Sequence, residues 1–152
     1  MSARILIVDD HEVVRQGVRS IISRSRPDWV VCGEASNGKE AIEAVRDLSP
    51  DVILLDITMP VMNGLEAAPQ IAKYGHPILI FTMHESDRLG VDVRKSGAQG
   101  FVLKSQAARD LIQAIETLLA GGTFFGPEVK APESSSGATL GMFFFCKAVC
   151  PA

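Results

Sequence analysis

The sequence predicts an α/β fold: a five-stranded parallel sheet in the order 2-1-3-4-5, with helices on both faces. Short apolar runs and segments of helical periodicity alternate five times along the chain, as in parallel sheets covered by helices. The run at residues 52–55 has no polar break, which is typical of a strand buried on both faces. Right-handed crossovers leave few ways to wind such a sheet, and we expect its switch point between the first and third strands.

The elements can be placed in chain order. The expected strands are residues 4–8, 29–35, 51–56, 77–82 and 100–103. Helical spacing of apolar residues predicts a first helix at residues 11–25 and a fourth, weakened by Gly90, at residues 86–96. The second helix is expected to begin after Asn37, which forms a capping box with Glu40, and to stop at Pro50.

The third and fifth helices have their own start and stop signals. The third follows Asn63 and Gly64, and Pro69 beyond its first turn predicts a kink or a late start. Ser105 is expected to cap the fifth helix, and the glycine pair at residues 121–122 to end it.

Composition indicates a soluble protein. A length of 152 residues is enough for one domain with a substantial core, and 47% hydrophobic and 22% charged residues are ordinary values for a globular chain. A net charge of −3 gives no case for nucleic-acid binding. No apolar run could span a membrane, no secretory signal is present, and three cysteines form no disulfide framework, so we expect a cytoplasmic protein.

The chain divides at about residue 122. Residues 1–122 carry the alternating pattern, whereas residues 123–152 have linker composition followed by a short apolar stretch. This tail could be disordered, dock on the body or contact a partner. It shows no basic recognition helix, so we expect no direct DNA binding by this chain.

Three carboxylates are expected to converge at the switch point. Asp9 and Asp10 end the first strand, and Asp56 ends the third, its neighbour in the sheet. Three such charges repel one another unless a cation is present, and oxygen ligands suit Mg²⁺. The alternative for Asp9 and Asp10 is a helix N-cap with a favourable charge on the helix dipole.

Two further polar residues follow neighbouring strands at the same edge. Thr82 closes the fourth strand, and Lys104 follows the fifth. Taken singly, each is an ordinary strand-end or loop residue. Together, a hydroxyl and an ammonium beside a metal-bound carboxylate predict a receptor for a phosphoryl group.

With these residues in view, the chain closely resembles the receiver domain of two-component response regulators, a CheY-like variant of the flavodoxin-like fold. The resemblance covers about residues 3–122. It is carried, in order, by Asp9-Asp10, Asp56, Met59-Pro60, Asn63-Gly64, Thr82, Phe101 and Lys104. The stretches at residues 81–85 and 97–104 look most like the subfamily that usually precedes a LuxR-type helix-turn-helix domain.

The resemblance implies a set of roles. Asp56 would take a phosphoryl group from the phosphohistidine of a sensor histidine kinase or a phosphotransfer protein. Asp10, Asp56 and the backbone carbonyl of Thr58 would hold Mg²⁺, with Asp9 helping through water. Lys104 would pair with the phosphoryl oxygens.

The resemblance also implies a switch. Thr82 would move towards the phosphoryl group and Phe101 would turn inward, changing a partner-binding surface. Simple core packing is the alternative role for Phe101. Receivers of this type often pair when phosphorylated, so a homodimer is a further expectation.

Two positions are expected to tune how long the phosphoryl group lasts. Thr58 and His84 lie two residues beyond Asp56 and Thr82. In the family, side chains at these positions flank the route of the hydrolytic water. A merely exposed histidine is the alternative for His84.

Other function classes are less consistent with the sequence. Haloacid-dehalogenase-type phosphatases need a second carboxylate two residues after the nucleophile, where this chain has Thr58. A phosphate-independent interaction module would not need the complete set of acids, threonine and lysine. We therefore expect a signalling switch and not an enzyme.

Overall fold

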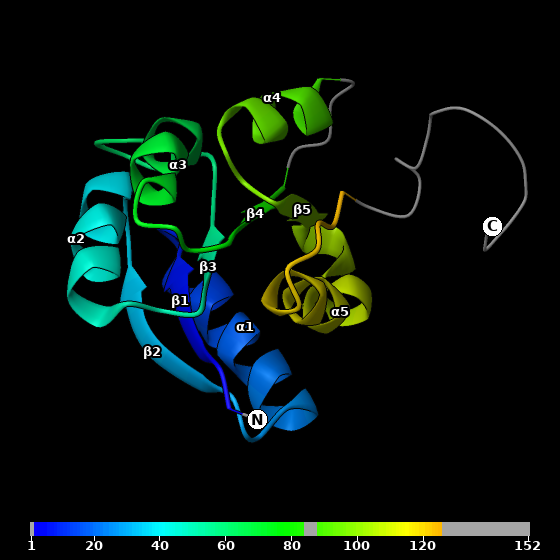
Figure 1. The fold of residues 1–152 in the computed structure, drawn as a ribbon. Helices are drawn as coiled ribbons and strands as arrows, with labels where there is room; N and C mark the ends of the chain where they lie inside the picture. Colours follow the sequence, from blue (N-terminus) through cyan, green and yellow to red (C-terminus); the bar gives the residue numbers. More distant parts are fainter. Residues whose placement is uncertain (1, 84–87, 126–152) are drawn as a thin grey trace, which may run out of the picture.

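The computed structural model describes residues 2–83 and 88–125 (Figure 1). Its five parallel strands form one sheet in the order β2-β1-β3-β4-β5, so the predicted fold class and strand order are confirmed. The strands are β1 Arg4–Val8, β2 Val30–Ala35, β3 Val52–Leu55, β4 Ile78–Thr82 and β5 Gly100–Leu103. Every residue of β3, β4 and β5 is buried, which explains why apolar and polar residues do not alternate along these strands.

Helices cover both faces of this sheet. They are α1 Glu12–Ser25, α2 Gly38–Leu48, α3 Gly64–Ala72, α4 Leu89–Lys95 and α5 Ala107–Leu119, with a 3₁₀ turn, η1, at Lys104–Gln106. Alternate residues of each strand point to opposite faces, so Ile5 and Ile7 pack against α1 and α5, whereas Leu6 and Val8 pack on the side of α2, α3 and α4 (Figure 1). The two hydrophobic layers fix the sheet between the helices and hold its carboxyl edge in place.

Helix α3 begins where its capping residues predict. The Asn63 side chain accepts a hydrogen bond from the Glu66 N–H (2.8 Å), and the Glu66 side chain accepts one from the Asn63 N–H (3.1 Å). This capping box satisfies the first turn, and the helix continues through Pro69 to Ala72. The late start predicted from Pro69 was therefore wrong.

Helix α5 does not begin as predicted. Ser105 lies inside η1 and does not cap α5, whose N-cap residue is Gln106 without a side-chain hydrogen bond. The prediction of a Ser105 cap was wrong because the chain first makes a tight turn after β5. This turn keeps Lys104 at the edge of the sheet and delays the helix.

The end of α5 is as predicted. Gly121 adopts a left-handed conformation with φ of 89°, and the N–H groups of Gly121 and Gly122 donate to the carbonyls of Leu118 (3.0 Å) and Thr117 (2.9 Å). This pair of hydrogen bonds is a Schellman motif, which satisfies the last carbonyls of a helix. It also reverses the chain towards the sheet.

Residues 122–125, here called the returning segment, then lie along β5. Phe124 forms a parallel bridge with Gly100, and Phe125 is buried. These contacts favour extending the domain body beyond the predicted boundary at residue 122, to Phe125. The predicted tail at residues 126–152 lies outside the described residues.

The opposite edge of the sheet has an irregular register. Ile5 pairs with Val31, but the next residue, Leu6, pairs with Gly33, so Cys32 is an extra residue in β2. Such a bulge bends an edge strand and increases its local twist.

Among the helices of the described part, none is long and apolar enough to cross a membrane.

Alanine substitutions at Gly17 and Gly121 should show how backbone conformation affects the free energy of unfolding. A Cβ at Gly17, within α1, or at Gly121 would meet nothing within 4 Å, so steric clashes do not separate the two sites. We expect Gly17→Ala to raise the free energy of unfolding by about 0.5–1 kcal/mol, because alanine favours the helix. We expect Gly121→Ala to lower it by about 1–2 kcal/mol, because the left-handed conformation disfavours a Cβ. Urea unfolding of both variants measures this, and a shift of the same sign in both would contradict it.

Candidate functional site

The candidate site is built on the carboxyl ends of β1 and β3. The backbone N–H of Asp9 donates to the Ala35 carbonyl (3.0 Å), and that of Asp56 donates to the Val8 carbonyl (2.9 Å). Both residues therefore continue the hydrogen bonding of the sheet by one position. This rigid attachment places two carboxylates next to each other at the switch point of the strand order.

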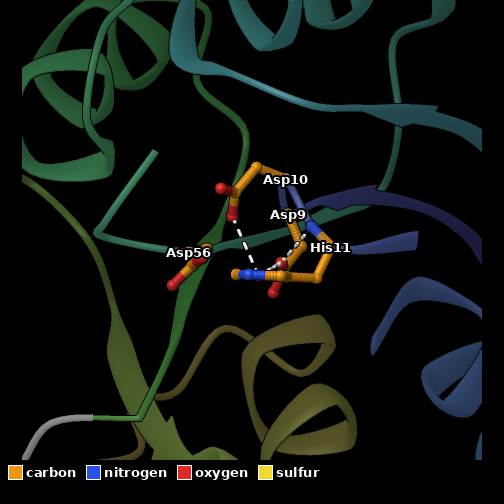
Figure 2. Close-up of side chains that lie close together, drawn as sticks. All are labelled: Asp9, Asp10, His11 and Asp56. Atoms are coloured by element: carbon orange, nitrogen blue, oxygen red, sulfur yellow. Dashed lines mark hydrogen bonds and ion pairs between the residues drawn. The ribbon is translucent and has the colours of Figure 1, made fainter. Parts of the chain in front are cut away.

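Four side chains converge there. Oxygen or nitrogen atoms of Asp9, Asp10, His11 and Asp56 all lie within 4.8 Å of one another (Figure 2). Asp9 is 1% and Asp56 4% exposed, whereas the Asp10 side chain is 28% exposed and lies at the mouth of the site. The structure thus brings together the three carboxylates that the sequence predicted to meet.

Lys104 joins this cluster from the far side of β4. Its Nζ lies 2.6 Å from Asp9 Oδ2 and 3.3 Å from Asp56 Oδ2. The lysine side chain is only 11% exposed. This ammonium contacts two of the three carboxylates, Asp9 and Asp56, so the three acids are not balanced by the lysine alone.

His11 is the member that the sequence analysis missed. Its backbone N–H donates to Asp9 Oδ1 (2.9 Å), and its Nδ1 lies 3.1 Å from Asp10 Oδ1 (Figure 2). The imidazole is 63% exposed and forms one rim of the site. Its position directly after two aspartates was the available signal, because a residue that precedes α1 by one position must lie near the end of β1.

The donor set fits a hard divalent cation. Asp9 Oδ2 and Asp10 Oδ1 are buried atoms that contact a nitrogen but receive no well-directed hydrogen bond from the described residues. Buried carboxylate oxygens that lack a well-directed hydrogen bond, in a site with more negative than positive groups, are suited to a cation that takes oxygen ligands, such as Mg²⁺.

The environment of Asp56 also shifts its protonation. Burial raises the pKa of the Asp56 carboxyl above its ordinary value, and the negative charge of Asp9 raises it further. The Lys104 ammonium and the Ile57 N–H, which donates to Asp56 Oδ1 (2.8 Å), act in the opposite direction. The carboxylate is therefore held in a position where its charge is costly without a bound cation.

The loop after Asp56 packs tightly against the site. A Cβ at Gly64 would lie 2.0 Å from the Asp56 carbonyl oxygen, so only glycine fits there. Val61 has φ of 70° at the centre of a three-residue turn closed by the Met62 N–H and the Pro60 carbonyl (2.7 Å). A β-branched residue in this conformation is strained, and such strain is concentrated at functional sites. Thr58 is exposed in the same loop.

Thr82 and Phe101 lie on one face of the sheet. Ile80 pairs with Phe101 and Thr82 with Leu103, so the Thr82 and Phe101 side chains are diagonal neighbours on the side of α4. Thr82 is 1% and Phe101 6% exposed. His84 lies outside the described residues.

Removing the charge of Asp56 should stabilise the metal-free protein. A raised pKa in the folded state means that this carboxyl lowers stability as pH rises from the ordinary aspartate range through the folded-state pKa. We therefore expect Asp56→Asn to unfold at a higher temperature than the parent at pH 7 in a chelator, with the advantage disappearing in acid. Added Mg²⁺ should narrow the gap by stabilising the parent.

Asp47→Asn is the matched control, because Asp47 is an exposed carboxylate on α2 and its loss changes the net charge equally. Thermal melts across pH measure the effect. Equal stabilisation by both substitutions would show that net charge, and not the site, is responsible.

Comparison with known proteins identifies the family. The family model of the response regulator receiver domain matches residues 5–116, which include Asp9, Asp10, Asp56, Thr82 and Lys104. The nitrate/nitrite response regulator protein NarL of Escherichia coli (strain K12) is 41% identical over 121 residues, or 78% of this chain and 56% of NarL. The chain spans little more than half the length of the curated relatives it matches.

Solved structures agree. A LuxR-family two-component response regulator from Aurantimonas sp. SI85-9A1 has a TM-score of 0.80 at 40% identity, over 85% of this chain and 93% of that one. The isolated receiver domain of RcsB from Salmonella enterica serovar Typhimurium has a TM-score of 0.75 at 25% identity, over 85% and 96%. The chain belongs to the response regulator receiver domain family.

Proposed function

We propose that Asp56 accepts a phosphoryl group from a phosphohistidine and that this transfer switches a partner-binding surface. The donor is a sensor histidine kinase or a phosphotransfer protein. The observation that carries the proposal is the buried Asp56 carboxylate, which shares its site with two further acids and the Lys104 ammonium. The RcsB receiver domain, which this chain resembles, was solved with the phosphomimetic BeF₃⁻.

The two oxygens of Asp56 have different surroundings that suit this reaction. Oδ1 accepts the Ile57 N–H, which fixes the carboxylate plane, and Oδ2 faces Lys104 Nζ at 3.3 Å. In the proposed transfer an Asp56 oxygen forms a bond to phosphorus while the N–P bond breaks, and the histidine nitrogen of the donor keeps the electron pair. Lys104 then neutralises charge on the phosphoryl oxygens, which is the main requirement of such a transfer.

The acids beside Asp56 are proposed to hold Mg²⁺. Asp10, Asp56 and the backbone carbonyl of Thr58 would be the ligands, with Asp9 contributing through water. The ion would supply positive charge at the phosphoryl oxygens. Asp9, which contacts Lys104 more closely than Asp56 does, also positions the ammonium.

Thr82 and Phe101 are proposed to form the switch. The Thr82 hydroxyl would hydrogen-bond a phosphoryl oxygen, and its movement would free space for Phe101 to turn inward. Their placement on one face of adjacent strands supports this coupling, because a shift of either side chain changes the packing of the other.

The protein is proposed to be a cytoplasmic signalling switch that accepts one phosphoryl group, without multiple turnover, and to form a homodimer on phosphorylation. These statements concern the receiver domain, because the relatives are longer than this chain.

A small phosphodonor tests the acceptor. Incubation of the chain with acetyl phosphate and Mg²⁺ should add one phosphoryl group, seen as a single mass increment that is stable in acid and labile in base. Asp56→Asn should abolish the increment, and Lys104→Ala should slow its formation by about 100-fold or more, as when a charge-stabilising group is removed from an active site. Asp47→Asn should react as the parent does. Turnover of added phosphoesters, or an adduct on another residue, would argue against the proposal.

The lifetime of the phosphoryl group tests Thr58 and His84. If each side chain screens the route of the hydrolytic water, truncation opens this route and shortens the half-life several-fold. The decay of the phosphorylated mass in Thr58→Ala and His84→Ala measures it. His76→Ala is the control, since His76 precedes β4 at the opposite edge of the sheet. An unchanged half-life in either test variant removes that residue from the proposal.

A further inference from the structure

The returning segment covers the outer edge of β5 with its own backbone. The Phe101 N–H donates to the Phe124 carbonyl (2.8 Å), and the Phe124 N–H donates to the Gln99 carbonyl (3.0 Å). A Cβ at Gly100 would lie 2.0 Å from the Phe124 carbonyl oxygen, so the two backbones approach as closely as glycine allows. The segment lies beyond residue 116, the last that the receiver family model matches.

Side chains add a second attachment. The Phe125 ring packs edge-on against the Phe101 ring, with centroids 6.1 Å apart and an interplanar angle of 68°. The Arg94 guanidinium of α4 lies over the Phe125 ring, 3.8 Å from its centroid. Phe125 is 7% exposed and Phe101 6%, so each ring is buried partly by the other.

The Phe124 and Phe125 side chains pack on opposite faces of the sheet. Phe125 belongs to the hydrophobic cluster that contains Phe101 and Ile80, and Phe124 packs against the cluster on the side of α1 and α5. Of the two aromatic residues, Phe125 is therefore the one that shares a face with Thr82 and the switch.

We propose that Phe125 couples the returning segment to the position of Phe101, so that phosphorylation of Asp56 loosens this segment from the edge of β5. The inference rests on the proposed function. When Phe101 turns towards Thr82, it leaves the edge-on contact with Phe125, and the segment loses the main side-chain support for its two hydrogen bonds to β5. The state of Asp56 is thereby transmitted to the chain that follows α5.

Amide hydrogen exchange of the full chain tests this, measured by NMR with and without beryllofluoride and Mg²⁺. The Phe101 and Phe124 amides should exchange about tenfold faster with beryllofluoride, because they are protected by local docking of the segment. The Gln99 amide is an internal control, since it donates to the Ile78 carbonyl in β4 (2.9 Å) and should not change. The ¹⁹F signal of bound beryllofluoride reports occupancy of the Asp56 site in the same samples.

Two variants separate coupling from simple packing. Phe125→Leu keeps an apolar side chain and residual protection but shortens the reach to Phe101, so the ratio of exchange rates with and without beryllofluoride should fall to near one. Phe124→Ala weakens the segment from the opposite face, so overall exchange should be faster while this ratio stays as in the parent.

The outcomes are distinct. A bound ¹⁹F signal with unchanged or slower exchange at Phe101 and Phe124 overturns the inference but not the proposed function. A Phe125→Leu ratio equal to that of the parent assigns Phe125 a packing role alone and also overturns the inference. If no beryllofluoride binds to the parent chain, the proposed function fails and the inference fails with it.

Discussion

The interaction between Lys104 and the acids at the ends of β1 and β3 is the constraint on which the site depends. Lys104 follows β5, two strands away from β3, and its long side chain must cross the end of β4 to reach Asp9 and Asp56. This crossing requires that the strands end in register and that η1 hold the start of the lysine close to the sheet. Loss of Lys104 would leave the buried charges of Asp9 and Asp56 without this cation, so the lysine holds the ends of the strands in a fixed relation.

The same site is a place where stability is lost. Asp56 carries its charge in a buried position, Val61 adopts a conformation unfavourable to valine, and Gly64 leaves no room for a side chain against the Asp56 carbonyl. These features are sustained by the hydrophobic layers on both faces of the sheet. The fold thus offsets local strain at Asp56 and Val61 with packing elsewhere in the sheet and helices.

Much of the fold could be predicted because the strong signals agree with one another. The unbroken run at residues 52–55 indicates a central strand, and the regular alternation with helical segments leaves one natural winding order. The acids, Thr82 and Lys104 could be assigned to one edge because parallel strands all end on the same side. Weaker signals failed where a tertiary contact prevailed. Ser105 would be a good helix cap in isolation, but it lies in the 3₁₀ turn that contains Lys104. Pro69 did not delay the start of α3, because the capping box at Asn63 stabilises the first turn.

Contacts between residues far apart in sequence were the part that local patterns could not give. Phe125 looked like the beginning of a linker, because nothing in its neighbours indicates that the chain turns back after Gly121 to meet Phe101. His11 was overlooked for a different reason: it contacts its sequence neighbours Asp9 and Asp10, but it was taken as the first residue of the first helix.

The two edge strands of the sheet, β2 and β5, differ in how they could pair with a strand of another chain. On the β2 side, the extra Cys32 disrupts the straight row of backbone donors and acceptors that an incoming strand would need. On the β5 side, the molecule already supplies a short strand of its own through Phe124. In this arrangement β-augmentation at β5 requires prior displacement of the molecule's own backbone.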